Sequence, residues 1–320
     1  MSATVSVKPL VESGLLTAIT VVLGSISFYM PVAGLVLVFI LPLPIALLGV
    51  RHGIRWSILS TLATALFSAV LLNPLHAIIM IVSFGISGIT MGHCLRSGYS
   101  PLKTLLLGAV AAMLSIAAGF LIGLHLMGVN IIDMQASAVR KGMEWALAHS
   151  RPGGPVSAQY ADKIDAITRL YLIVYPAGFA VSALIFSYIN LAVARVVLAR
   201  LEHPIASFPP LRRWTMPGWL VIAYGAALLA SYYGQAKNIA LVYNLGLNLQ
   251  LATNSLLLIQ GLAGFAHLAR KYSLPRWASI VLVTLLFSHE LLTQLLLLAG
   301  LFDLAFDLRK LRPPRTGSAG

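Results

Sequence analysis

The chain has 320 residues, of which 59% are hydrophobic and only 10% are charged, and its net charge is +13. Soluble globular domains carry about 25% charged residues, and they cover their surface with more polar groups than this composition offers. The composition therefore excludes a soluble domain and predicts an all-α, polytopic transmembrane helical bundle. It also argues against a membrane β-barrel, because barrel strands alternate in polarity at every second residue and these apolar runs are continuous.

Eight or nine apolar segments are expected to form membrane helices, since a helix needs about 20 apolar residues to cross the hydrocarbon. A polar stretch, 128–168, separates the fifth segment from the sixth. Part of this stretch has the apolar stripe and charged opposite face of a helix that lies at the membrane surface. The segments lie near residues 10–29, 32–50, 54–73, 75–94, 102–127, 169–198, 218–234, 239–269 and 277–302.

Three regions follow from this order of segments. Residues 1–200 are expected to form a six-helix membrane bundle, whose polar insert, 128–168, lies outside the cell. Residues 201–312 are expected to add a C-terminal membrane region of two or three helices. Residues 313–320 form a tail.

The basic residues predict which loops face the cytoplasm, because Lys and Arg are enriched in short cytoplasmic loops. A cytoplasmic N-terminus places twelve basic residues in inner loops, including the Arg-His-Gly-Ile-Arg sequence at 51–55, which is predicted to turn at Gly53. The basic tail also favours a cytoplasmic C-terminus, which nine full crossings do not give. Either the last segment enters the membrane and returns, with a bend near 288–290, or the tail is an exception.

Several function classes find no support in the residues. The basic residues are scattered between apolar runs, which argues against a nucleic-acid partner. The single cysteine, Cys94, excludes an internal disulfide and a cysteine-based metal site, and the histidines lack metal-ligand spacing. The sequence contains no phosphate-binding Gly-x-x-x-x-Gly-Lys-Ser/Thr loop and no arrangement of a nucleophile with a histidine that indicates catalysis. We therefore expect no enzyme activity, no cofactor and no metal.

Small residues and hydroxyls mark the helix faces that pack, because lipid gives helices no hydrophobic reason to associate. Gly14 and Ala18 lie one turn apart in the first segment, and Gly88 and Gly92 do so in the fourth. We interpret both pairs as surfaces for helix packing or for a partner subunit. In the third segment a hydroxyl stripe predicts a further packing face, formed by Ser57, Ser60, Thr61, Thr64 and Ser68.

The eighth segment contains several carboxamides. Asn244 and Asn248 share one face of the predicted helix, and Gln250 and Asn254 form an adjacent stripe. A carboxamide is costly to bury in a membrane without a hydrogen-bonding partner, so this face must contact protein or water. Two interpretations remain open: a pocket that binds a polar ligand, or hydrogen bonds between helices worth about 0.6–2 kcal/mol each.

His289 and Glu290 form an adjacent ionisable pair within the last apolar segment. A carboxylate inside a membrane typically marks a ligand contact or a proton carrier, and we include both residues among the candidate ligand-binding residues. Two structural alternatives stay open. The carboxyl is neutral and hydrogen-bonded to a neighbour, or the pair lies at the bend of a re-entrant segment.

Five stretches carry a family resemblance. They are LVESGLLTAITVVLGSISFYMP (10–31), LPLPIALLGVRHGIRWSILS (41–60), FPPLRRWTMPGWLVI (208–222), IQGLAGFAHLARKY (259–272) and LAGLFDLAFDLRKL (298–311). Together they resemble the YybS-like family of bacterial predicted membrane proteins, whose function is not established. The resemblance extends over residues 10–312 and implies an integral membrane protein without implying an activity.

A second resemblance covers residues 10–198. The six segments and the outer insert before the sixth are similar to the substrate-capture subunits (S components) of energy-coupling-factor vitamin transporters. In that family, small residues one turn apart on the first helix contact a shared coupling subunit. Gly14 and Ala18 match that pattern, whereas Val22 stands where another small residue is expected. The three C-terminal segments are a departure, and the resemblance assigns no substrate-contact residue.

These observations lead to two main hypotheses. In the first, the chain captures a small polar molecule, and a membrane coupling subunit with an ATPase drives the release of that molecule. In the second, the chain is a membrane scaffold for the cell envelope and has no transported ligand. A third hypothesis is a proton-coupled carrier that uses Glu290. The lipid bilayer is a partner in each case, and we expect the protein in the cytoplasmic membrane of a bacterium.

Overall fold

The computed structural model describes residues 7–150, 158–201, 205–206 and 208–311. Every regular element in these residues is a helix, which confirms the predicted all-α class. The predicted tail, 313–320, lies outside the described residues. The elements are α1 Val7–Tyr29, α2 Pro31–Leu37, α3 Pro42–His52, α4 Ile54–Leu71, α5 Pro74–Ile79, the π-helix η1 Met80–Gly85, α6 Ile86–Arg96, α7 Pro101–Met127, α8 Ile131–Ser150, α9 Ala158–Arg200, the short 3-10 helix η2 Leu211–Arg213, α10 Trp219–Ala236, α11 Ala240–Lys271, α12 Arg276–Ser288 and α13 Glu290–Phe306.

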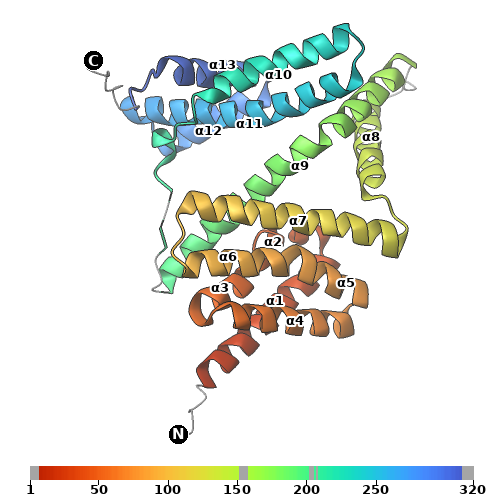
Figure 1. Ribbon diagram of the computed structural model, residues 1–320, viewed down its shortest axis with the longest axis vertical. Coiled ribbons are helices and arrows are strands. Elements are labelled where there is room, and N and C mark those ends of the chain that lie inside the picture. Colours follow the sequence, from red (N-terminus) through yellow and green to blue (C-terminus); the bar gives the residue numbers. More distant parts are fainter. Residues whose placement is uncertain (1–6, 151–157, 202–204, 207, 312–320) are drawn as a thin grey trace, which may run out of the picture. The chain divides into compact units, whose positions relative to one another are not determined.

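The chain divides into two compact units, and helix α9 contributes to both (Figure 1). Unit 1 consists of Met1–Tyr160 and Ser182–Ser207, and unit 2 consists of Ala161–Val181 and Phe208–Gly320. The end of unit 1 lies close to the domain boundary expected near residue 200. The sequence, however, did not indicate that part of α9 belongs with the C-terminal helices.

Seven helical stretches of the described chain are long and apolar enough to cross a membrane, and the bent pair α12–α13 counts as an eighth if it is one span. The predicted polytopic architecture is therefore confirmed, while the orientation of the N-terminus stays a prediction. Helix α10, expected as a span at 218–234, packs along α11 and is not one of the seven. Helix α9 begins at Ala158, eleven residues before the expected start at 169, because the polar residues after 158 continue into the apolar helix without a break.

Unit 1 contains the turn that the sequence predicted at 51–55. Helix α3 ends at His52 and α4 begins at Ile54. The residue between them, Gly53, has a φ of 97°, a conformation that glycine adopts without the steric cost that a Cβ brings. The turn is therefore confirmed.

Hydroxyl contacts join α4 to its neighbours in unit 1. The Thr17 hydroxyl of α1 hydrogen-bonds the Ser60 hydroxyl of α4 at 2.8 Å, and Ser57 Oγ donates to the Ile45 carbonyl of α3 at 2.9 Å. The stripe predicted as a packing face is buried along its whole length, which confirms that prediction. Its members are Ser57, Ser60, Thr61, Thr64 and Ser68.

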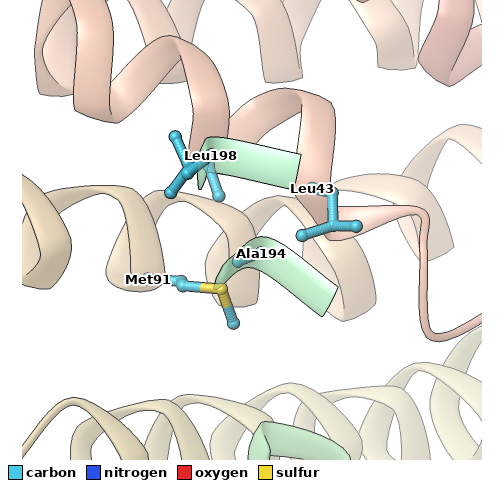
Figure 2. Close-up of a cluster of buried hydrophobic side chains, with 5 residues drawn as sticks. Leu43, Met91, Ala194 and Leu198 are labelled. Carbon is cyan, nitrogen blue, oxygen red and sulfur yellow. The ribbon is translucent and has the colours of Figure 1, made fainter. Parts of the chain in front are cut away.

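An apolar cluster in unit 1 brings together three helices that are far apart in the sequence. Figure 2 shows Leu43 of α3, Met91 of α6, and Ala194 and Leu198 of α9 directed toward one another. All four side chains are less than 9% exposed. The C-terminal part of α9 therefore packs in unit 1 against helices that precede it by about 100 to 150 residues in the chain.

Unit 2 is built on the antiparallel pair α10–α11. The two backbones approach closely at Gly234 and Gly246, where a Cβ would meet the backbones of Tyr243 and Ser231. Helix α13 crosses α11 in a similar way at Gly261 and Gly300. The apolar core between these helices consists of Leu220, Leu257 and Leu304.

The last apolar segment, expected near 277–302, is broken in two. Helices α12 and α13 meet at His289 with a bend of 108°. His289 is extended, with φ −130° and ψ 128°, and its Nδ1 accepts a hydrogen bond from the Leu291 N–H at 3.2 Å. The imidazole therefore caps the N-terminus of α13.

Candidate functional site

Asn248 contacts helix α9 through both ends of its carboxamide. Its Oδ1 accepts a hydrogen bond from the Ala177 N–H at 3.0 Å, and its Nδ2 donates to the Ile173 carbonyl at 2.7 Å. Nδ2 also donates to the Asn244 carbonyl at 2.8 Å, one turn earlier in α11. In a regular α-helix, the N–H of residue 177 would bond the carbonyl of residue 173 directly. The side chain of Asn248 bonds both of these backbone groups.

The reason for this insertion lies in the sequence of α9. Pro176 is inside the helix, and a proline lacks the N–H that would bond the carbonyl four residues before it. Its ring also crowds that carbonyl and opens the hydrogen-bond ladder locally. Asn248 then satisfies the two backbone groups at 173 and 177. In this structure Asn248 acts as a hydrogen-bonding link between helices, which is one of the two interpretations left open by the sequence.

The other candidate carboxamides of α11 make fewer hydrogen bonds through their side chains than Asn248 does. Asn244, Gln250 and Asn254 are all partly buried. The Oδ1 atom of Asn254 is buried and has no hydrogen-bond partner among the described residues. An amide oxygen in that position carries a substantial desolvation cost unless a ligand, water or partner supplies a donor.

His289 and Glu290 lie at the bend between α12 and α13 and are exposed. Glu290 Oε1 accepts a weak hydrogen bond from Gln294 Nε2 at 3.3 Å. Within the part of the chain that the structure describes, no hydrogen bond joins either residue to a carboxamide of α11. The six candidate ligand residues therefore occupy two separate places in unit 2.

The two pairs of small residues have different surroundings. Gly88 and Gly92 lie on α6 against α3, and a Cβ at Gly92 would stand 2.7 Å from the Ala46 carbonyl oxygen. Gly14 on α1 has open space where its Cβ would be, and Ala18 is exposed. The first pair is used for packing inside unit 1, whereas the second faces outward from it.

Unit 2 also contains a buried ionic network that the sequence did not reveal, which we call the C-terminal clasp: Gln260, Asp303 and Arg309. Asp303 Oδ2 accepts from Gln260 Nε2 at 2.6 Å and from Arg309 Nε at 2.8 Å. The side chains of Arg309 and Asp303 are only 5% and 6% exposed. Such a pair is stable in the interior only when further hydrogen bonds satisfy both ions.

The clasp meets that condition through the segment that precedes α10. The Met216 N–H donates to Gln260 Oε1 at 2.9 Å. Arg309 donates to the Arg212 carbonyl at 2.9 Å and to the Trp214 carbonyl at 2.8 Å. One sequence signal did exist, because Asp303 stands at the end of an apolar run, with Arg309 six residues later.

A second ionic contact lies in unit 1. Glu12 Oε2 on α1 lies 3.0 Å from an Arg51 guanidinium nitrogen and 2.8 Å from His52 Nε2. These side chains are between 14% and 26% exposed. Arg51, interpreted from the sequence only as a determinant of membrane orientation, therefore also ties the α3–α4 turn to α1. Elsewhere in the described chain, no group of three or more His, Cys, Asp or Glu side chains could hold a metal ion.

Each network joins stretches that carried the family resemblance. Glu12 comes from 10–31 and Arg51 from 41–60, while the C-terminal clasp joins 208–222, 259–272 and 298–311. The fold and these buried contacts define a polytopic helical membrane protein. The chain belongs to the family described as "Predicted membrane protein (DUF2232)", whose model matches residues 18–304.

Known proteins include a relative of similar length. The "Uncharacterized protein YybS" of Bacillus subtilis (strain 168) is 26% identical over 305 residues, which cover 94% of this chain and 97% of that protein. The predicted resemblance to the YybS-like family is thereby confirmed. No solved structure matches the chain. The similarity of residues 10–198 to S components stays a prediction.

Proposed function

We propose that this membrane protein captures a small polar molecule through the carboxamides of α11 and works without catalysing a reaction. The observation that supports this most directly is Asn254, whose Oδ1 is buried without a donor among the described residues. Gln250 lies one turn away, so the two amides offer donors and acceptors at neighbouring positions. A ligand with hydroxyl or amine groups would relieve the desolvation cost at Asn254.

The proposal includes a partner subunit in the membrane that couples release to an ATPase. It is supported by the outward-facing pair Gly14 and Ala18 on α1. Small residues one turn apart let the backbone of another helix come close, which is how membrane helices associate. We place the complex in the bacterial cytoplasmic membrane, in line with the Bacillus relative.

Native mass spectrometry of the purified chain tests the capture role. We expect a small molecule bound to the wild-type protein and at least a tenfold loss of its occupancy in Asn254→Leu. Ser255→Ala is the matched control, because the Ser255 hydroxyl donates to the Leu251 carbonyl of its own helix at 2.9 Å. If the wild-type protein carries no small molecule, or if Asn254→Leu retains it, the capture role is wrong.

A membrane scaffold is the second candidate, and a different observation supports it. Asn248 and Gln260 use their amides for contacts inside unit 2, which is the interpretation of the α11 carboxamides as links between helices. A scaffold without a ligand predicts that cross-linking in membranes recovers a protein complex from the wild type. Gly14→Leu would weaken that complex, while Gly119→Leu, also with open space at its Cβ position, would leave it intact.

A further inference from the structure

The end of α13 is fixed to the segment that enters α10. Arg309 is the residue that makes this contact, through the carbonyls of Arg212 and Trp214 and through its ion pair with Asp303. Its side chain is 5% exposed, so the contact is part of the interior of unit 2. The chain that leaves α13 therefore lies at the same end of unit 2 as the chain that enters α10.

Helix α12 also begins near that end. Helices α10 and α11 are antiparallel and joined by a short turn at Lys237–Ile239, so α11 returns to the end from which α10 started. Only four residues separate Lys271, the last residue of α11, from Arg276, the first of α12. Figure 1 shows the start of α10 and the ends of α11 and α13 toward the same end of this unit.

Helix α12 is too short to cross the bilayer by itself, and the α12–α13 pair is sharply bent. Helix α12 has 13 residues and spans about 20 Å, which is less than the roughly 30 Å of the hydrocarbon core. The 108° bend at His289 then turns the chain back. A chain that enters with α12 therefore turns inside the bilayer before it reaches the far side.

The surface of α12 fits acyl chains. The helix has no buried residue, and most of its exposed side chains are apolar, including Trp277 at 70%, Ile280 at 67% and Leu285 at 52%. In water such a helix would be unstable, because it would expose apolar side chains on all of its sides. Arg276 and Trp277 at its start are residue types that anchor helices at the membrane interface.

We propose that α12 and α13 form a re-entrant hairpin, covered on the α12 side by lipid acyl chains, whose two ends lie on the same side of the membrane. The charges agree with this arrangement, because one side then holds all the basic residues near these ends. They are Arg212, Arg213, Arg270, Lys271, Arg276, Arg309 and Lys310. With α10 crossing the membrane beside α11, eight crossings precede the hairpin, and the basic tail then lies on the same side as the N-terminus.

Single cysteines in a Cys94→Ala background test on which side of the membrane each helix end lies. Lys271→Cys reports the end of α11, Lys310→Cys the chain after α13, and Lys237→Cys the opposite end of the α10–α11 pair; all three lysines are exposed. A maleimide that cannot cross membranes is applied to intact cells and to inverted membrane vesicles. We expect Lys310→Cys and Lys271→Cys to react in the same preparation and Lys237→Cys in the other. If Lys310→Cys reacts together with Lys237→Cys, the hairpin is wrong.

The depth of the bend is tested separately, with Ser288→Cys. Inside the bilayer, this cysteine should be unreactive toward the impermeant maleimide in both preparations and become reactive after detergent is added. Reaction in the same preparation as Lys237→Cys would mean that α12 crosses completely, and reaction together with Lys271→Cys would mean that α12 lies on the membrane surface. Either result overturns the re-entrant hairpin, and neither bears on whether α11 binds a ligand.

Discussion

A substitution in the C-terminal clasp and one at Asn248 would leave different groups without partners: a buried charge in the first case and uncharged backbone groups in the second. Asp303 neutralises Arg309 in an interior where both are almost inaccessible to water. Removing one member of such a pair strands the other charge in a medium that solvates it poorly. Asn248 carries no charge, but its side chain bonds a backbone donor and a backbone acceptor that flank Pro176 in α9.

Asp303→Asn should lower the free energy of unfolding by about 3–5 kcal/mol, because the guanidinium of Arg309 would remain buried without a counter-ion. The matched control is Glu290→Gln, the same isosteric change at an exposed carboxyl. We expect the control to stay within about 0.5 kcal/mol of the wild type. Titration with SDS from a mild detergent measures both values. Equal losses in the two variants would contradict a role for the clasp in stability.

Asn248→Leu should lower the free energy of unfolding by about 1–3 kcal/mol, because the Ala177 N–H and the Ile173 carbonyl lose the partner that the side chain of Asn248 provides. Asn244→Leu is the control, since Asn244 contributes its backbone carbonyl and not its side chain to the link. Hydrogen exchange at the Ala177 amide should accelerate in the first variant and not in the second. Unchanged exchange in Asn248→Leu would show that the amide is protected in another way.

At the scale of helices, spacing in the sequence predicted which faces are suited to packing but not their neighbours. Gly14 with Ala18 and Gly88 with Gly92 give the same signal, yet in the described part of the chain the second pair packs closely on α3 while Gly14 has open space at its Cβ position and Ala18 is exposed. The contact of Gly261 with Gly300 gave no signal, because the two residues belong to different segments. The helices, the turn at Gly53 and the hydroxyl stripe were predictable because each depends on neighbours close in the sequence.

Gly92→Leu tests the packing of α6 on α3. A leucine there would collide with the backbone of Ala46 and Gly49, so we expect the folded yield and the thermal midpoint in detergent to fall sharply. Gly14→Leu introduces the same side chain into open space, and the isolated protein should tolerate it. If Gly14→Leu lowers the folded yield and the thermal midpoint as much as Gly92→Leu does, the Gly14 face of α1 must be packed against another part of this chain.

At the scale of the whole molecule, each unit has its own ionic contact, and the two contacts share no residue. Glu12 joins α1 to the α3–α4 turn in unit 1, and the C-terminal clasp joins α11 and the end of α13 to the segment that precedes α10 in unit 2. Asp303 and Arg309 are six residues apart, whereas the other partners in these contacts are separated by 39 to 97 residues in the sequence. The local pattern offered only Asp303 and Arg309, and it carried no information about the distant partners Gln260, Arg212 and Trp214 or about Glu12 with Arg51.

Glu12→Gln and Asp303→Asn should therefore act independently. Glu12→Gln should lower the free energy of unfolding by less than about 1 kcal/mol, because the contact of Glu12 with Arg51 is partly exposed to solvent. In the double variant, the two losses should add to within about 0.5 kcal/mol. A double-mutant cycle from SDS titrations measures this difference. A coupling energy well above about 0.5 kcal/mol would mean that the two contacts do not stabilise the protein independently.

The link between Asn248 and α9 has a consequence for how the protein is made. The ribosome adds Asn248 71 residues after Ala177, so α9 enters the bilayer before its missing hydrogen bonds can be supplied. Unsatisfied backbone groups are unfavourable in hydrocarbon. Until α11 has been synthesised, the Ala177 N–H and the Ile173 carbonyl lack the partner that the side chain of Asn248 gives them in the folded protein. The order of synthesis therefore makes this contact a late event, which completes α9 only after α11 has joined it.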